Sequence, residues 1–139
     1  MKRPLLVAAV AVLSLGFVHR APHPYHIVFD LSSRDTLDQK MALRLMTEAS
    51  SSANPTVQVE LVMYGKGFEL VMPERSPYLA QVQELLRRPN VAFRVCEIAM
   101  RNNGIEKRQL QAGVGTVPDG LYELVSKQQD DWGYIKVVH

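Results

Sequence analysis

The alternation of short apolar runs with amphipathic stretches is the feature that most constrains how this chain folds. Runs rich in β-branched and aromatic residues are each followed by a stretch whose apolar residues recur with a helical period. Strands separated by about 10–15 residues of helical pattern are typical of βαβ units, in which the strands are parallel and the crossovers right-handed. The sequence therefore predicts an α/β fold, a three-layer sandwich around a mainly parallel sheet of about five strands.

Five strands and four helices are expected along the chain. The strands are predicted at residues 25–31, 57–63, 91–95, 114–117 and 132–138, and the helices at residues 36–49, 77–88, 97–103 and 118–129. Residues 68–72 fit either a short extended piece or a helical turn. Ser76 followed by Pro77 predicts the cap and the first residue of the second helix. The buried face of that helix is expected to include Val82 and Leu85.

The amino terminus has the pattern of a targeting segment. Two basic residues precede the uncharged stretch from Leu5 to Val18. Its length suits the apolar core of a signal peptide and is short of the ~20 residues that a membrane-spanning helix needs. The residues that follow make a poor cleavage site, so an uncleaved anchor stays open. We expect residues 1–21 to place the protein in the periplasm or outside the cell, and residues 22–139 to form one domain.

Charge and cysteine content exclude several classes of function. From Ala21 onward the chain has 13 basic and 14 acidic residues, a net charge of −1. This balance leaves no basic face, so we expect no binding to nucleic acid. Cys96 is the only cysteine, which excludes an intrachain disulfide and disfavours a zinc site built on cysteines. We expect neither a metal nor a cofactor.

The residues with chemical potential follow the predicted strands. Ligands of open α/β sheets bind outside the carboxyl ends of the strands, where Asp30, the turn at residues 64–67 and Cys96 lie. Cys96 stands where a strand ends and a helix begins, so backbone N–H groups near its sulfur favour the nucleophilic thiolate. The alternative is a structural role, because free cysteine is among the most buried residue types.

The segment around the cysteine resembles a known family. Residues 91–100 (VAFRVCEIAM) are similar to the strand–cysteine–helix segment of the DsrE/DsrF-like family, and residues 117–120 (VPDG) and 132–135 (WGYI) match its second half. The resemblance covers about residues 25–138. It implies a flavodoxin-like fold, assembly into trimers or hexamers, and sulfur relay through a persulfide at the position of Cys96. Ile98 stands where relatives often carry asparagine.

These observations predict a persulfide sulfur carrier outside the cytoplasm. Cys96 is the expected catalytic residue, and Tyr64, Gly65, Lys66 and Arg101 are the expected substrate-binding residues. Tyr64 replaces a histidine that is frequent in relatives, and Lys66 or Arg101 is expected to steady anionic sulfur. The expected partners are a sulfur donor or acceptor protein, a small polysulfide and further copies of the chain. The alternative is a non-catalytic oligomeric α/β module that binds a small ligand, with a merely structural cysteine.

Overall fold

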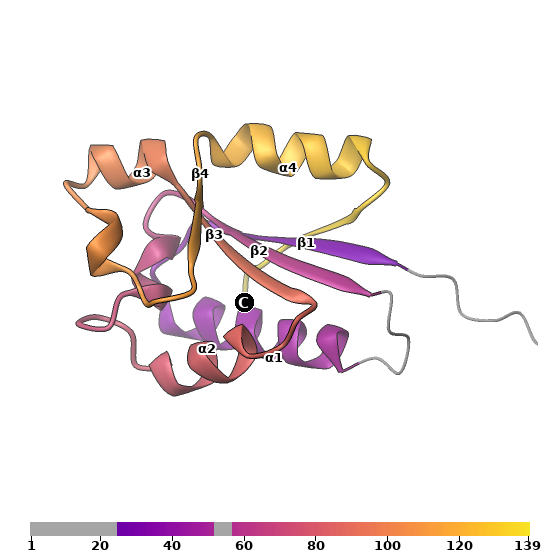
Figure 1. The fold of residues 1–139 in the computed structure, drawn as a ribbon, viewed down its shortest axis with the longest axis horizontal. Helices are drawn as coiled ribbons and strands as arrows, with labels where there is room; N and C mark the ends of the chain where they lie inside the picture. Colours follow the sequence, from indigo (N-terminus) through magenta and orange to yellow (C-terminus); the bar gives the residue numbers. More distant parts are fainter. Residues whose placement is uncertain (1–24, 52–56) are drawn as a thin grey trace, which may run out of the picture.

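A sheet of five strands, all parallel, lies at the centre of the fold (Figure 1). Its strand order is β4-β3-β2-β1-β5. The strands are β1 (His26–Leu31), β2 (Gln58–Met63), β3 (Val91–Cys96), β4 (Gly115–Val117) and β5 (Gly133–Lys136). The structure is a computed structural model that describes residues 25–51 and 57–139, so the predicted targeting segment lies outside the described residues. Within those two ranges, no helix is long and apolar enough to cross a membrane.

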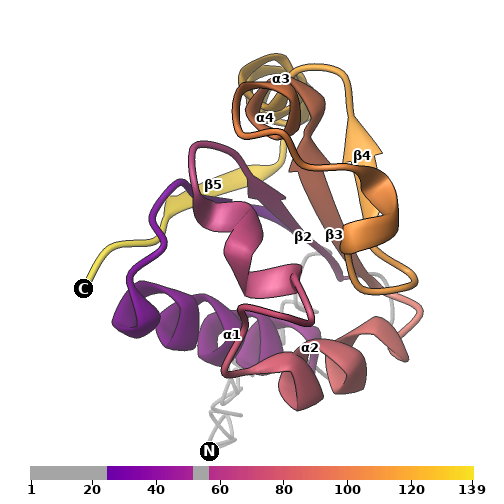
Figure 2. The same ribbon diagram turned by 90° about the vertical axis from the view of Figure 1, so that its left-hand side faces the viewer.

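Helices cover both faces of the sheet. Figures 1 and 2 show α1 (Thr36–Ser50) and α2 (Leu79–Leu86) on one face, and α3 (Glu97–Asn102) and α4 (Gly120–Gln129) on the other. Two 3-10 helices, η1 (Gly67–Val71) and η2 (Lys107–Gln109), lie in the connections. This arrangement confirms the predicted three-layer α/β sandwich of flavodoxin-like type.

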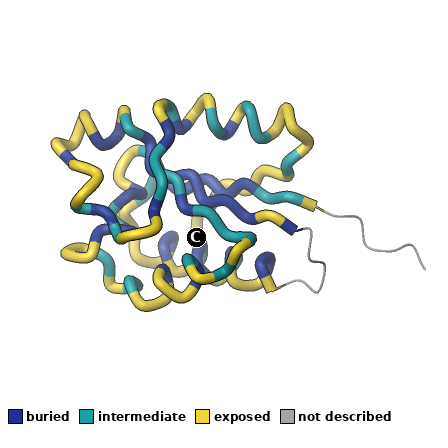
Figure 3. Tube along the Cα trace, viewed as in Figure 1, coloured by how far each residue is buried: buried dark blue, intermediate teal, exposed yellow. Residues whose placement is uncertain are grey.

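The two faces of the sheet bury different amounts of apolar surface. Side chains alternate between the faces along each strand, and Phe29 and Phe93 belong to a large apolar core shared with α1 and α2. The apolar cluster beneath α4 is much smaller and consists of Val28, Val62 and Leu124. Figure 3 shows burial concentrated along the strands, with the outer sides of the helices exposed. The face beneath α4 therefore has room for polar groups.

A buried carboxylate, Glu60, occupies part of that space. Its Oε2 atom lies 3.1 Å from Lys127 Nζ on α4 and 3.8 Å from Arg94 Nε. Burial raises the pKa of Glu60 above its ordinary value, and the nearby Lys127 charge offsets this only in part. Lys127 also lies 4.1 Å from the centre of the Trp132 ring. The contacts of Lys127 with Glu60 and the Trp132 ring, and the burial of Leu124, thus hold α4 on the sheet.

The second helix begins later than its sequence signal predicts. Its first residue is Leu79 and its N-cap is Tyr78, so the predicted cap at Ser76 and first helical position at Pro77 are wrong. The Ser76 hydroxyl instead accepts the backbone N–H of Tyr78 at 3.2 Å. Serine side chains stabilise such local turns as readily as helix caps, which is why the signal misplaced the boundary. Val82 and Leu85 are buried, so the predicted core face is confirmed.

His139 is paired with the first turn of α1. Its Nδ1 atom lies 2.9 Å from Asp38 Oδ1, and its backbone N–H donates to the same oxygen at 2.8 Å. The hydrogen bond to Asp38 raises the pKa of His139. Burial acts to raise the pKa of Asp38, but its hydrogen bonds with His139 and Ser33 outweigh burial and lower that pKa. The segment after β5 is thereby held against α1.

We expect His139→Asn to lower the melting temperature more at about pH 5.5 than at about pH 8. The ion pair between Asp38 and His139 contributes its full stabilisation of the folded state when Asp38 is ionised and His139 is protonated. This holds at pH values between the unfolded-state pKa of the aspartate, about 4, and that of the histidine, about 6.5. This contribution is lost as the pH falls through the lowered pKa of Asp38, and as it rises through the raised pKa of His139. Thermal unfolding of the wild type and the variant at the two pH values measures the difference in melting temperature. An equal difference at both pH values would contradict this pH dependence.

Candidate functional site

Cys96 lies at the carboxyl edge of the sheet, as the last residue of β3 and the N-cap of α3. Its side chain caps no N–H of α3. Instead, Cys96 Sγ accepts a hydrogen bond at 3.2 Å from the backbone N–H of Gly120, the first residue of α4. The residue is only 5% exposed. The sulfur is therefore held by the helix that starts 24 residues later, and the sequence interpretation missed this contact.

A pocket of about 270 Å³ opens to solvent beside the cysteine. It is lined by Cys96 at the end of β3 and by residues that follow β2, β3 and β4, namely Tyr64, Gly65, Ile98, Ala99, Asn102, Asn103, Asp119 and Leu121. This lining is apolar or neutral apart from Asp119, whose carboxylate caps α4 by accepting the N–H of Leu121 at 2.9 Å. Although Cys96 is nearly buried, the pocket connects it with solvent.

The structure brings three of the predicted site residues together and leaves two apart. Tyr64 and Gly65 share the pocket with Cys96, whereas Lys66 is not among its lining residues. Arg101 lines a separate cavity of about 240 Å³ with Glu97. Successive helical residues point about 100° apart, so the residues of α3 divide between the two cavities. The roles of Lys66 and Arg101 in binding sulfur stay predictions.

The turn that carries Tyr64 needs a glycine at position 65. Gly65 has a φ of +54°, a conformation that favours glycine, and a Cβ there would lie 2.8 Å from the carbonyl oxygen of Ser32. The same oxygen accepts the N–H of Lys66 at 3.0 Å. The turn after β2 is thus fixed against the loop after β1, and this contact places Tyr64 at the pocket.

Tyr64 is hydrogen-bonded to the buried carboxylate of Asp30. Asp30 Oδ2 accepts the Tyr64 hydroxyl at 3.2 Å and the Tyr134 hydroxyl at 2.6 Å, and Lys136 Nζ lies 3.8 Å away. Asp30 is only 2% exposed. Its other oxygen, Oδ1, is buried with no hydrogen-bond partner among the described residues. The hydrogen bond to Asp30 raises the pKa of Tyr134 to about 12, so this tyrosine keeps its proton.

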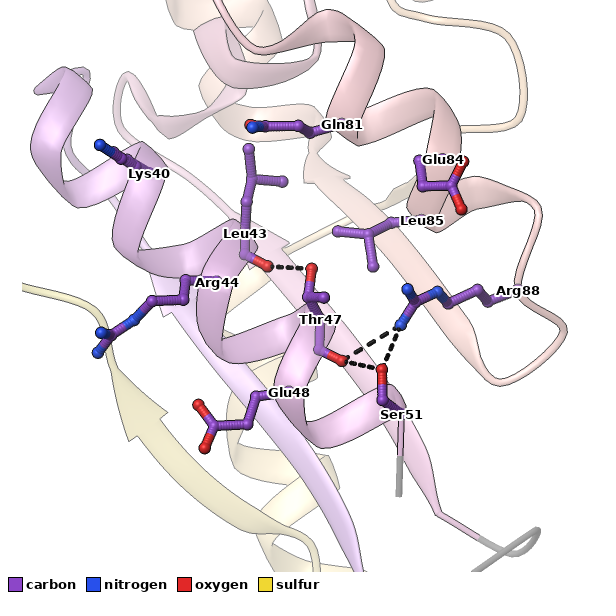
Figure 4. Close-up of a pocket in the computed structure, with 10 residues that line it drawn as sticks. All are labelled: Lys40, Leu43, Arg44, Thr47, Glu48, Ser51, Gln81, Glu84, Leu85 and Arg88. Atoms are coloured by element: carbon purple, nitrogen blue, oxygen red, sulfur yellow. Dashed lines mark hydrogen bonds between the residues drawn. The ribbon is translucent and has the colours of Figure 1, made fainter. Parts of the chain in front are cut away.

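A larger cavity, of about 580 Å³, lies between α1 and α2 (Figure 4). Four of its charged residues, Lys40, Arg44, Glu48 and Glu84, are exposed. The fifth, Arg88, is half-buried and donates to the Thr47 carbonyl and the Ser51 hydroxyl. Thr47 and Ser51 are at the end of α1 that leads to the start of β2, whereas ligands of such sheets bind at the opposite, carboxyl edge. We therefore place the candidate site at the smaller pocket, where the thiol and Tyr64 lie.

Comparison with known proteins shows to which family the chain belongs. The model of the DsrE/DsrF-like family matches residues 25–137. The chain belongs to the DsrE/DsrF-like family. This family is generally linked to sulfur relay, and its member described here has a single cysteine.

The chain is also similar to solved structures. The protein of unknown function MTH1491 from Methanobacterium thermoautotrophicum is 26% identical, with a TM-score of 0.74 over 81% of this chain and 98% of that one. No curated protein matches. The resemblance inferred from the residues around Cys96 is confirmed by the family match.

Proposed function

We propose that this DsrE-family protein carries sulfane sulfur as a persulfide on Cys96. The observation that carries the proposal is the position of its only cysteine. Cys96 lines an open pocket at the carboxyl edge of the sheet, and its sulfur accepts the N–H of Gly120. That N–H is the first of a ten-residue helix, so it also offers a partial positive charge to a negative sulfur.

The proposed reaction is an exchange between sulfur atoms that needs no oxidant or reductant. The Cys96 thiolate attacks the terminal sulfur of a hydropersulfide, R–S–SH, and a new S–S bond forms as the donor's S–S bond breaks. The leaving R–S⁻ keeps the bonding electrons and takes up a proton equivalent to the one lost from Cys96. The products are Cys96–S–SH and R–SH. Because the chain has no second cysteine, the acceptor thiol for discharge has to come from another molecule.

The second candidate function is a non-catalytic module that binds a small ligand in the same pocket. The burial of Cys96 and its hydrogen bond to Gly120 favour this alternative, because both fit a packed, structural thiol. The two functions differ in whether the folded protein takes up sulfur at this residue.

We expect the folded protein to gain the mass of one sulfur atom after treatment with an alkyl hydropersulfide, and Cys96→Ser to gain none. Intact-mass spectrometry under native conditions measures the gain, and circular dichroism checks that the variant is folded. Serine is close to cysteine in size, but its hydroxyl is a poor nucleophile toward sulfur, so Cys96→Ser is a matched control. Uptake that begins only after denaturation would reject the carrier and favour the binding module.

We further propose that the protein acts in the periplasm or outside the cell, either released or held by an uncleaved anchor. The charge and apolar pattern of residues 1–21 support this location. Fractionation of a tagged protein tests it, since a wholly cytoplasmic protein would contradict export. The amino-terminal residue of the exported form distinguishes cleavage from anchoring.

We also propose that the outer face of α4 joins copies of this chain. Leu121, Tyr122 and Val125 are all exposed on this helix, and Ile98 of α3 is exposed beside the same pocket that Leu121 lines. Exposed apolar groups on neighbouring helices are typical of protein interfaces, and assembly is expected from the family. In such an assembly the second copy borders the cysteine pocket.

We expect the double variant Leu121→Asp, Val125→Asp to have a lower mass in light scattering than the wild type. Two charges on the outer face of α4 oppose its burial against another copy. Leu37→Asp is the control, because Leu37 is also exposed but belongs to α1 on the opposite side of the sheet. A monomeric wild-type protein at micromolar concentration would contradict self-association.

A further inference from the structure

The wall of the cysteine pocket is apolar where it reaches solvent. Ile98 of α3 and Leu121 of α4 both line the pocket and are exposed, and the buried Ala99 also lines it. When an apolar group fills such a pocket, the apolar surfaces of the ligand and of the wall leave water together, which favours binding. The volume of about 270 Å³ suits a small molecule rather than a folded partner.

The start of α4 borders the same pocket, but its backbone donors are already paired. The Gly120 N–H donates to Cys96 Sγ at 3.2 Å. Asp119 Oδ1 accepts the N–H groups of Leu121 and Tyr122 at 2.9 and 3.4 Å, and the next N–H of the helix donates to the Asp119 carbonyl at 3.1 Å. The four N–H groups that a helix leaves open at its start are therefore occupied before a ligand enters.

The lining also offers no counter-charge to an anion. None of the described residues that line the pocket has a positive charge, and Asp119 has a negative one. Lys66 and Arg101 are adjacent in sequence to lining residues but do not line the pocket themselves. A charged group that leaves water for this pocket would lose hydration without a cation to replace it. An uncharged apolar group has no such loss.

We infer that the cysteine pocket takes small, uncharged molecules whose sulfur carries an apolar group, and that Ile98 and Leu121 determine this specificity. Applied to the proposed function, on which this identification of the substrate rests, the preferred donor is a small alkyl hydropersulfide, R–S–SH. Its R group packs against Ile98 and Leu121 while Cys96 attacks the terminal sulfur, and the exchange of bonds is the one given above. The preference is one of rate, so a polar thiol such as glutathione also reacts, but more slowly.

The test measures how addition of a maleimide to Cys96 depends on the apolar chain that the reagent carries. N-methylmaleimide and N-propylmaleimide have the same reactive ring and differ by two methylenes. We define the chain factor as the ratio of their rate constants, propyl over methyl, on the folded protein, divided by the same ratio for 2-mercaptoethanol at the same pH. This definition cancels the thiolate fraction. Full burial of two methylenes would give about fifteenfold, and we expect about three- to tenfold in a pocket open to solvent.

A charged reagent of matched length tests the exclusion of anions. In 3-maleimidopropionic acid a carboxylate replaces the terminal methyl of the propyl chain. On the same scale, with this reagent in place of N-propylmaleimide, we expect a factor of about one or less. A factor equal to that of N-propylmaleimide would overturn the inference, because the pocket would then accept the anion as readily as the apolar chain.

Four variants assign the chain factor to the pocket wall. Ile98→Thr and Leu121→Asn replace an apolar wall residue by a polar one of similar size, and each should lower the factor toward one. Val125→Asn is the control for assembly, because Val125 is exposed on the same face of α4 but does not line the pocket. Leu37→Asn is the control for a general surface effect, since Leu37 is exposed on α1. Both controls should keep the wild-type factor.

The inference is overturned by a wild-type chain factor of one or less, by no addition to the folded protein, by a wild-type factor in Ile98→Thr or Leu121→Asn, or by an equal fall in Val125→Asn. If one wall variant does not fold, as checked by circular dichroism, the other decides. Maleimide addition involves no sulfur transfer, so its outcome is independent of the mass measurement. A chain factor of three or more in a protein that takes up no sulfur would contradict the proposed function while supporting this specificity.

Discussion

Leu85→Ala is expected to lower the free energy of unfolding by about 2–5 kcal/mol. Leu85 is 1% exposed and belongs to the core that α1 and α2 form with the sheet, so alanine leaves a cavity there. Denaturant titration measures the change. Leu37→Ala is the control, because Leu37 is 55% exposed and its loss should cost less than about 0.5 kcal/mol. Equal effects of the two substitutions would contradict the assignment of the buried face of α2.

Gly120→Ala is expected to slow sulfur uptake by Cys96 about tenfold. A Cβ at this position would lie 3.0 Å from Cys96 Cβ and 3.4 Å from Val62 Cγ1, so α4 or the cysteine has to move. Movement lengthens the hydrogen bond between the Gly120 N–H and the sulfur. A hydrogen bond worth about 1–1.5 kcal/mol corresponds to about a tenfold change in rate if it acts in the transition state.

The rate of mass gain with a hydropersulfide measures this effect, with Gly133→Ala as the control. A Cβ on Gly133 would lie 3.6 Å from the His26 carbonyl oxygen, an ordinary contact remote from the cysteine pocket. Uptake at the wild-type rate in Gly120→Ala would show that the N–H of Gly120 does not assist Cys96.

The order and type of the main elements follow from local patterns, and this is why they were predictable. The runs that became β1 and β3 are β-branched and aromatic, and α1 has a regular apolar stripe. The start of α2 was not predictable, because Ser76 and Pro77 suit a helix cap and a turn equally. Residues 68–72 were ambiguous for a similar reason, and most of that stretch forms the short η1 helix.

The site was predictable to the extent that the topology places it. Cys96 ends a parallel strand, Tyr64 follows one and Asp30 is the next-to-last residue of one, so the carboxyl edge of the sheet gathers them. The partners of these side chains depend on tertiary contacts that have no local signal. Gly120 starts a helix predicted from residues 118–120, but only the packing of α4 on β2 and β3 brings its N–H to the sulfur.

The central claim is that Cys96 carries sulfur in the folded protein, and the most direct measurement follows loading and discharge in one sample. Intact mass is recorded before treatment, after an alkyl hydropersulfide, and after removal of the donor and addition of glutathione as acceptor thiol. We predict a gain of one sulfur atom, its loss on addition of glutathione, and recovery of that sulfur as glutathione persulfide. A folded protein that gains no sulfur, or that keeps it in the presence of the acceptor, would contradict the claim.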